Sequence, residues 1–219
     1  MKKTVIIAAA GRGSRLGAGT PKCLVEVNGH AIFEYQLKAF QWADEVRMVV
    51  GYKAEEVMRR VASINDKVVF VSNKEYSSTT TLQSYFLGAK GINSKALFID
   101  GDMMISREAG EQLCQKFDVG EPFIGVAKEL SEQPVYAGVK DRCVQWFSYE
   151  RKSDYEWANV ALLDTSLLEY NHTHFYIQLG KYLPVKALEI ERVEIDTNAD
   201  LTDARQKILK FPDKYNFWR

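Results

Sequence analysis

Several features are scarce or missing in this sequence of 219 residues, and each excludes a class of protein. The three cysteines, Cys23, Cys114 and Cys143, form no CxxC pair and have no zinc-ligand spacing, which is typical of reduced thiols inside a cell. The apolar run at residues 5–10 is far too short to span a bilayer, and glycine and arginine follow it at once, unlike in a signal peptide. The sequence therefore predicts a cytoplasmic protein that does not insert into a membrane.

The chain also has no net charge, because Lys+Arg and Asp+Glu both number 29. A general binder of nucleic acid or of an anionic membrane would need an excess of basic residues, so neither partner is expected. The composition is 46% hydrophobic and 12% aromatic, which suffices for a sizeable core. We therefore expect a single domain over residues 1–219, in which any phosphate chemistry comes from a local cluster of positive charge.

The first half alternates apolar, strand-like runs with stretches of helical spacing. This alternation is typical of a mostly parallel sheet with helices on both faces. Strands are predicted at residues 4–9, 45–50, 68–71 and 96–99, and helices at residues 32–40, 54–62 and 80–90. Because ligands bind beyond the carboxyl ends of the strands in such sheets, the segments that follow residues 9 and 99 should meet in space.

From about residue 122 the pattern changes to short strands joined by polar turns. Strands are predicted at residues 123–127, 135–139, 143–149, 158–163 and 188–195, with short helices at 167–170 and 176–182 and a later one at 201–209. We expect this part to be antiparallel and to fold over the mouth of the first part. The predicted fold is α/β, with a Rossmann-like, mixed but mostly parallel sheet, helices on both faces and a small antiparallel, lid-like region.

A glycine-rich loop follows the first strand and carries the strongest functional signal. Gly11 and Gly13 let the backbone turn tightly and bring its N–H groups close to an anion, while Arg12, Arg15 and Lys22 add positive charge that suits a triphosphate. The loop lacks both GxxxxGK(S/T) and the third glycine of GxGxxG, which excludes a Walker P-loop and disfavours a dinucleotide site. The predicted nucleotide contacts here are Ala9, Ala10, Gly11, Arg12, Gly13, Ser14, Arg15 and Lys22.

Acidic residues follow two of the predicted strands. Asp100 and Asp102 come directly after the apolar run at 96–99, and Asp196 ends the run at 188–195. Mg²⁺ prefers hard oxygen ligands and commonly binds one or two carboxylates together with phosphate oxygens. Both segments are therefore candidates for a magnesium site, although their spacing in the chain does not pair them.

The loop and the acidic segments together resemble a known family. Residues 9–16 read AAGRGSRL and residues 21–22 read PK, which is similar to the GxGxRL…PK signature of the sugar-1-phosphate and phosphocholine nucleotidyltransferases, a superfamily with a MobA-like fold. Residues 194–201, EIDTNADL, resemble the ending of its phosphocholine cytidylyltransferase members. The resemblance implies Mg²⁺-dependent transfer of a nucleoside monophosphate to a small phospho-acceptor. It implies catalytic roles for Lys22, Arg15 and Asp102, metal binding by Asp102 and Asp196, and a loop- or ribose-positioning role for Asp100.

The same resemblance assigns the segment at Thr80, Thr81 and Ser84 to recognition of the base, in place of an NNxxSL element in relatives. Threonine keeps the hydrogen-bonding capacity but leaves the base open, and the short chain favours the cytidylyltransferase branch, so CTP is the preferred nucleotide. A cationic head group on the acceptor, as in phosphocholine or aminoethylphosphonate, would call for aromatic faces and carboxylates. Candidates in the second half are Tyr136, Glu156, Trp157 and Asn159.

Two other functions stay open at this point. One is a sugar-1-phosphate nucleotidyltransferase that uses UTP, GTP or dTTP, and the other is an inactive nucleotide-binding regulatory module. The joint presence of Arg15, Lys22, Asp102 and Asp196 argues against the second, since a pure binder needs no pair of metal carboxylates. We expect residues 1–121 to form the nucleotide-binding half and residues 122–219 the acceptor-binding half, while the oligomeric state is not predicted.

Overall fold

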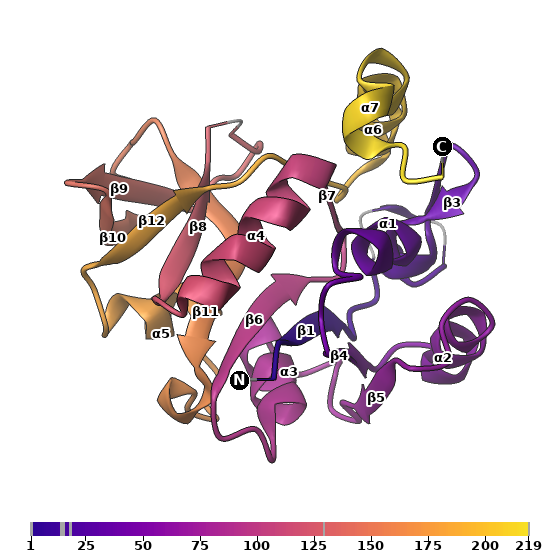
Figure 1. Ribbon diagram of the computed structural model, residues 1–219, viewed down its shortest axis with the longest axis horizontal. Helices are drawn as coiled ribbons and strands as arrows, with labels where there is room; N and C mark the ends of the chain where they lie inside the picture. Colours follow the sequence, from indigo (N-terminus) through magenta and orange to yellow (C-terminus); the bar gives the residue numbers. More distant parts are fainter. Residues whose placement is uncertain (1, 14–15, 18, 129, 219) are drawn as a thin grey trace.

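A nine-stranded mixed sheet forms the centre of the protein (Figure 1). The computed structural model describes residues 2–218 apart from 14–15, 18 and 129. The strands of this sheet are β1 Thr4–Ala9, β4 Glu45–Val50, β5 Val69–Ser72, β6 Lys95–Asp100, β8 Phe123–Ala127, β9 Tyr136–Lys140, β10 Cys143–Ser148, β11 Glu156–Asp164 and β12 Val185–Glu189. They lie in the order β5-β4-β1-β6-β11-β8-β12-β10-β9. The predicted α/β fold class is confirmed.

Four strands from the first half of the chain are parallel. β1 pairs with β4 on one side and with β6 on the other, and β4 pairs with β5. Because successive side chains of a strand point to opposite faces, Val5 and Ile7 enter one core cluster while Ile6 enters another. The carboxyl ends of β1 and β6, at Ala9 and Asp100, therefore lie at the same edge of the sheet, where the glycine-rich loop begins.

The second half continues the same sheet instead of forming a separate lid. β11 runs antiparallel between β6 and β8, and β12 returns parallel to β8 before the antiparallel strands β10 and β9. Nearly all of β11 is buried and most of its residues are apolar, as expected of a strand that is covered on both faces. Asn159 has a φ of 54°, and the register of β11 against β8 shifts between Trp157 and Ala161. At this bulge the side-chain amide of Asn159 donates a hydrogen bond to Oε1 of Glu194 at 3.3 Å.

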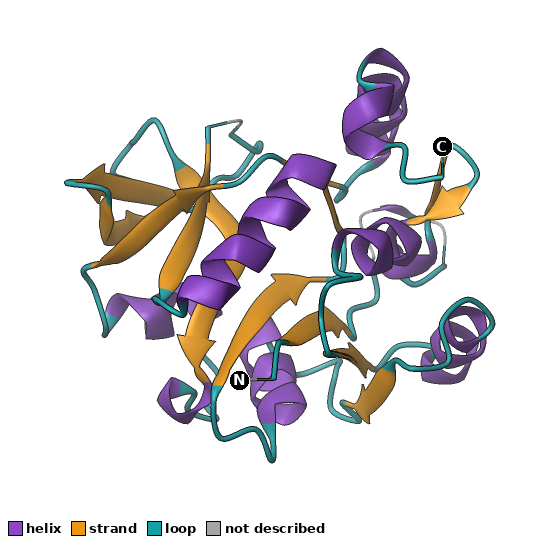
Figure 2. Cartoon of the chain, viewed as in Figure 1, coloured by secondary structure: helices purple, strands orange, loops and turns teal. Residues whose placement is uncertain are grey.

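Helices cover both faces of the sheet, as predicted (Figures 1 and 2). On one face lie α1 Ile32–Ala39, α2 Ala54–Ala62 and α4 Arg107–Val119, whose apolar residues share a core cluster with Val5 and Ile7. On the other face lie α3 Thr81–Ala89 and α5 Phe175–Gly180, packed against Ile6. In Figure 1, α4 crosses in front of the sheet and α3 lies behind it.

The prediction of one strand at residues 188–195 was wrong. The chain leaves the large sheet after Glu189, and β13 (Arg192–Glu194) pairs antiparallel with β7 (Met103–Ile105) in a separate two-stranded sheet. A continuous apolar pattern does not reveal that a chain changes its pairing partner part-way. A further small sheet joins β2 (Glu26–Val27) to β3 (His30–Ala31), and the chain continues through α6 (Asn198–Lys210) and α7 (Pro212–Tyr215).

Two helix assignments also differ from the sequence prediction. Helix α4 was not predicted, although its Ser106 side chain accepts a hydrogen bond from the Ala109 N–H and Gly120 closes the helix with a φ of 74°. Both are common boundary signals, because they satisfy backbone groups that a helix end leaves without partners. The predicted helix at 167–170 is absent, and only a short 3-10 turn, Thr165–Leu167, forms there.

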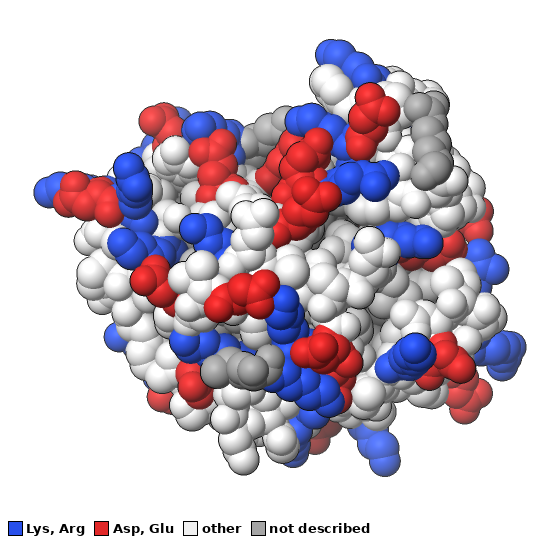
Figure 3. Space-filling model, viewed as in Figure 1, with Lys and Arg blue, Asp and Glu red and all other residues white. Residues whose placement is uncertain are grey.

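The surface agrees with the charge balance. On the face shown in Figure 3, positive and negative side chains are intermingled, without one continuous basic area. Within the described part of the chain, no helix combines the length and the apolar character that crossing a membrane would require.

Candidate active site

The glycine-rich loop and Lys22 form the first part of the site. Gly11 and Gly13 line a cavity of about 220 Å³ together with Lys22 and Asp102. Gly13 has a φ of 63°, and a Cβ atom at this position would lie 2.5 Å from Cγ of Lys22. Glycine is therefore required here both by the backbone conformation and by the passage of the lysine side chain. The predicted contacts Ser14 and Arg15 lie outside the described residues.

Lys22 begins a 3-10 turn, Lys22–Leu24, directly after Pro21. Its Nζ atom lies 2.9 Å from Oδ2 of Asp102 and also forms an ion pair with Oδ1 of Asp196. Burial alone would lower the pKa of the ammonium, but the two carboxylates outweigh it, and the pKa of Lys22 is raised. Lys22 is therefore a permanent cation between the two aspartates that the sequence proposed as metal ligands.

A cluster of three carboxylates stands beside this lysine. Oxygen atoms of Asp102, Glu194 and Asp196 all lie within 4.8 Å of one another. The pairing of β7 with β13 creates the cluster, because it aligns Met103 with Glu194, and the Ile195 N–H donates a hydrogen bond to the Asp102 carbonyl at 3.0 Å. The sequence pattern did not single out Glu194, which precedes Asp196 by two residues.

The electrostatics of the cluster suit a cation. Burial, followed by the charges of Asp102 and Asp196, raises the pKa of Glu194 to about 7, although the charge of Arg192 acts in the opposite direction. Oδ1 of Asp102 is buried and has no hydrogen-bond partner among the described residues. A buried carboxylate oxygen without a partner is costly, and a bound cation would satisfy it. Three carboxylates around one point therefore fit a divalent metal with hard oxygen ligands.

Asp100 lies in a different environment, although only Gly101 separates it from Asp102. The Tyr85 hydroxyl donates a hydrogen bond to Oδ1 of Asp100 at 2.5 Å, and the side chain of Gln36 donates to its carbonyl at 2.7 Å. Burial, and then the charge of Asp102, raises the pKa of Asp100 well above its ordinary value. Asp100 lines both cavities of the site.

Of the three residues predicted to recognise the base, Thr80, Thr81 and Ser84, only Thr81 lines the cavities of the site, and it lines both of them. Thr80 precedes α3, and its hydroxyl oxygen lies 2.8 Å from Oε1 of Gln83 and 2.8 Å from the Thr173 carbonyl oxygen, either of which can accept its single proton. Ser84 is 4% exposed and its hydroxyl accepts a hydrogen bond from Asn73, and it belongs to neither cavity lining.

A second, larger cavity of about 710 Å³ lies beside the carboxylate cluster. Three of the four predicted acceptor residues, Glu156, Trp157 and Asn159, line it, whereas Tyr136 does not. Sequence reasoning missed most of the aromatic lining, which comes from elements far apart in the chain: Tyr85, Tyr149, Phe175 and Tyr176. Arg12 is exposed in the glycine-rich loop, with its guanidinium 5.7 Å from the centre of the Tyr76 ring.

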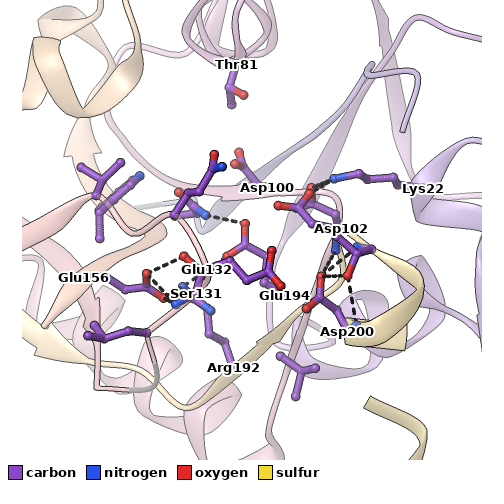
Figure 4. Close-up of a pocket in the computed structure, with 18 of the residues that line it drawn as sticks. Lys22, Thr81, Asp100, Asp102, Ser131, Glu132, Glu156, Arg192, Glu194 and Asp200 are labelled. Atoms are coloured by element: carbon purple, nitrogen blue, oxygen red, sulfur yellow. Dashed lines mark hydrogen bonds and ion pairs between the residues drawn. The ribbon is translucent and has the colours of Figure 1, made fainter. Parts of the chain in front are cut away.

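Figure 4 shows how the site is assembled. Lys22 and Asp102 point toward each other on one side, Glu156, Ser131 and Arg192 form a second group, and Glu194 lies between them. A glycine-rich loop, a half-buried cation and a carboxylate cluster near the carboxyl ends of parallel strands define an α/β protein built to handle phosphate groups. The chain belongs to the MobA-like NTP transferase domain family, which matches residues 5–165.

Curated proteins match parts of this chain. The bifunctional protein GlmU of Aliarcobacter butzleri is 28% identical over 141 residues, which are 63% of this chain and 31% of the relative. The chain thus spans about a third of the length of this relative. The 2-C-methyl-D-erythritol 4-phosphate cytidylyltransferase of Thermotoga neapolitana is 43% identical over 56 residues, which are 26% of this chain and 25% of the relative.

Solved structures share the fold over almost the whole chain. The CTP:phosphocholine cytidylyltransferase LicC of Streptococcus pneumoniae has a TM-score of 0.78 at 22% identity and covers 95% of this chain and 100% of its own. The inositol-1-phosphate CTP transferase of T. maritima has a TM-score of 0.76 at 19% identity, with 94% of this chain and 96% of its own covered. At these identities the likeness establishes the common fold.

Proposed function

We propose that this protein is a Mg²⁺-dependent cytidylyltransferase that transfers CMP from CTP to a small phosphorylated or phosphonate acceptor. The observation that carries the proposal is the junction of the two cavities. Lys22, Thr81, Asp100 and Asp102 line both of them. Two substrates bound one in each cavity would therefore meet at the lysine and the carboxylates, as a group transfer between them requires.

The proposed reaction is a single in-line displacement. An anionic oxygen of the acceptor attacks the α-phosphorus of CTP, a new P–O bond forms there, and the bond to the β-phosphate breaks to release pyrophosphate. The nucleophile is already an anion at neutral pH, so neither a general base nor a covalent enzyme intermediate is needed. Catalysis then consists of aligning two polyanions and neutralising the charge between them.

The residues of the smaller cavity suit the nucleotide. We propose that backbone N–H groups of the loop from Ala9 to Gly13, with Arg12 and Arg15, hold the β- and γ-phosphates. Lys22 is half-buried beside the junction and stabilises charge on the α-phosphate, and Thr81 contacts the nucleotide from the start of α3. Residues 1–121 thus serve mainly the nucleotide and residues 122–219 mainly the acceptor.

The carboxylate cluster suits magnesium. Asp102 and Asp196, which the sequence proposed, would hold the ion together with Glu194. When bound, Mg²⁺ neutralises charge on the phosphate oxygens and so favours their approach. Oδ1 of Asp102, buried and without a hydrogen-bond partner among the described residues, supports this role.

The larger cavity suits an acceptor with a cationic head group, as in phosphocholine or aminoethylphosphonate. Aromatic rings of Trp157, Phe175 and Tyr176 line it, together with the exposed carboxylate of Glu132. An ammonium group is attracted both to aromatic faces and to carboxylates. Two of the structural neighbours are by name transferases of CTP, which supports CTP as the nucleotide, whereas the name of another indicates a glucose-1-phosphate thymidylyltransferase. A cytoplasmic location for the enzyme stays a prediction.

A pyrophosphate-release assay tests the proposal. The full chain is incubated with Mg²⁺, one of CTP, UTP, GTP or dTTP, and phosphocholine, aminoethylphosphonate or a sugar 1-phosphate. We expect release that needs an acceptor and is fastest with CTP and a cationic acceptor. Fastest release with a sugar 1-phosphate and another nucleotide would replace the proposal by that activity, and no release with any pair would refute nucleotidyl transfer with these substrates.

A further inference from the structure

A buried ion pair links the larger cavity, the proposed acceptor site, to the carboxylate cluster. Glu156, the first residue of β11, is 1% exposed, and Arg192, the first residue of β13, is 7% exposed. Nη2 of Arg192 donates to Oε1 of Glu156 at 2.6 Å and lies 3.2 Å from Oε2 of Glu194. One guanidinium therefore lies between two carboxylates, one of which belongs to the candidate metal site.

The remaining hydrogen-bonding capacity of Glu156 goes to one residue. The Ser131 N–H lies 3.1 Å from each carboxylate oxygen, and the Ser131 hydroxyl donates to Oε2 at 2.8 Å. Glu156 thus has three contacts with Ser131 and one with Arg192, and both of its oxygens are occupied. Its carboxylate is committed to the protein, which speaks against the direct acceptor contact that the sequence suggested.

Ser131 belongs to a segment that forms part of the cavity wall. Residues 130–133 all line the larger cavity, and all four side chains are exposed. Among the described residues, the only hydrogen bonds of this segment are those from Ser131 to Glu156. Figure 4 shows Ser131 directed at Glu156, with Glu132 adjacent. An exposed segment with few hydrogen bonds opens readily, so the position of residues 130–133 depends on the hydrogen bonds between Ser131 and Glu156.

We propose that Glu156 is a positioning residue that, paired with Arg192, fixes residues 130–133 as part of the wall of the larger cavity, where the acceptor binds. This inference rests on the proposed function, because it assigns that wall to acceptor binding. A carboxylate accepts stronger hydrogen bonds than a neutral amide does. In addition, removing one charge of a buried ion pair leaves the other charge buried without its partner. Glutamine at position 156 keeps the size of the side chain but weakens both ends of the link, so the acceptor loses affinity while the nucleotide does not.

Steady-state kinetics of three variants test the proposal. Glu156→Gln should raise KM for the acceptor about tenfold, and KM for the nucleotide should stay within about twofold, which separates lost positioning from general damage. Ser131→Ala removes one hydroxyl from an exposed residue, so its fold is safe, and it should raise the acceptor KM about threefold. Glu121→Gln, on an exposed loop, is the matched control and should leave both constants unchanged.

The double variant Glu156→Gln/Ser131→Ala identifies the route of the effect. If Glu156 acts through Ser131, Ser131→Ala should have a much smaller effect in the Glu156→Gln background than in the wild-type chain, because it removes a bond that the first change has already weakened. Independent, multiplying effects, or an acceptor KM within about twofold of wild type in both single variants, would overturn the proposal. Should Glu156→Gln fail to fold, an unchanged acceptor KM in Ser131→Ala would overturn it by itself.

Hydrogen exchange separates this inference from the proposed function. In the wild-type chain, the amide of Ser131 should exchange more slowly than its neighbours, and Glu156→Gln should remove that protection. An unprotected Ser131 amide would overturn the anchor even if the enzyme is active. A protected amide in a wild-type protein that releases no pyrophosphate would leave the anchor intact and overturn the proposed function, and with it the acceptor role of the wall.

Discussion

Gly101, between the two aspartates at the end of β6, offers a sharp test of how the sheet positions the site. Its N–H donates a hydrogen bond to the Ala8 carbonyl at 2.9 Å, so the backbone here lies directly against β1. A Cβ atom at position 101 would lie 2.8 Å from the Ala8 oxygen and 2.9 Å from Cα of Ala9. Both are backbone atoms of a central strand, and they cannot yield by a side-chain rotation.

The size of the effect follows from these contacts. Overpacking of a rigid interior costs roughly 1–3 kcal/mol, and Gly101→Ala should lower the free energy of unfolding by that amount. For a chain of this length, each kcal/mol shifts the midpoint of thermal unfolding by about 2–4 °C. The backbone shift that relieves this clash should also displace Asp102 relative to Lys22 and Asp196. Because a misplacement of about 1 Å can cost a hundredfold in rate, we expect turnover to fall at least tenfold.

Urea denaturation and pyrophosphate release measure the two effects separately. Gly180→Ala is the matched control, because a Cβ atom at position 180 would have no heavy atom within 4 Å. It should keep wild-type turnover and change the free energy of unfolding by no more than about 1 kcal/mol. Wild-type stability and turnover in Gly101→Ala would refute the claim that close contact between β6 and β1 positions the aspartates.

Two further predictions concern the charged groups of the site. Lys22→Ala should lower turnover at least about a hundredfold while circular dichroism shows a folded protein, since it removes the cation at the cavity junction, and near-normal turnover would contradict its assigned role. Burial raises the pKa of Glu194 from its ordinary 4.5 to about 7, so the folded protein keeps a proton that the unfolded chain releases. In the presence of a chelator, this group should make the free energy of unfolding fall as pH rises from about 4.5 to 7, with the full loss present above pH 7. Glu194→Gln should remove that part of the slope in urea titrations, and identical slopes in both proteins would contradict the raised pKa.

Local signals allowed much of the parallel half to be predicted. β1, β4 and α2 have the same ends in the structure as in the sequence prediction. Strands buried on both faces read as unbroken apolar runs, and amphipathic helices repeat with their own period, so neither depends on distant residues. The glycine-rich loop and Lys22 were visible for the same reason, because their chemistry lies within a few residues.

The rest of the site depends on pairings that no local pattern contains. Glu194 reaches Asp102 only because β13 pairs with β7, and no local pattern indicates that the run at 188–195 breaks in two. Likewise, Glu156 was a reasonable acceptor residue by type and position, yet its partners Ser131 and Arg192 lie on separate segments. The roles of buried charges depend on those partners, and partners are set by tertiary structure.

In the proposed reaction, a nucleotidyl group moves onto the acceptor's own phosphate or phosphonate. Phosphorus NMR of a reaction with CTP, phosphocholine and Mg²⁺ tests it most directly, because a diphosphate bridge has its own pair of coupled signals. We predict that these signals grow together with free pyrophosphate in equal amounts and that both are absent when acceptor is omitted. CTP consumed without a new bridge, or with inorganic phosphate in place of pyrophosphate, would contradict nucleotidyl transfer to the acceptor.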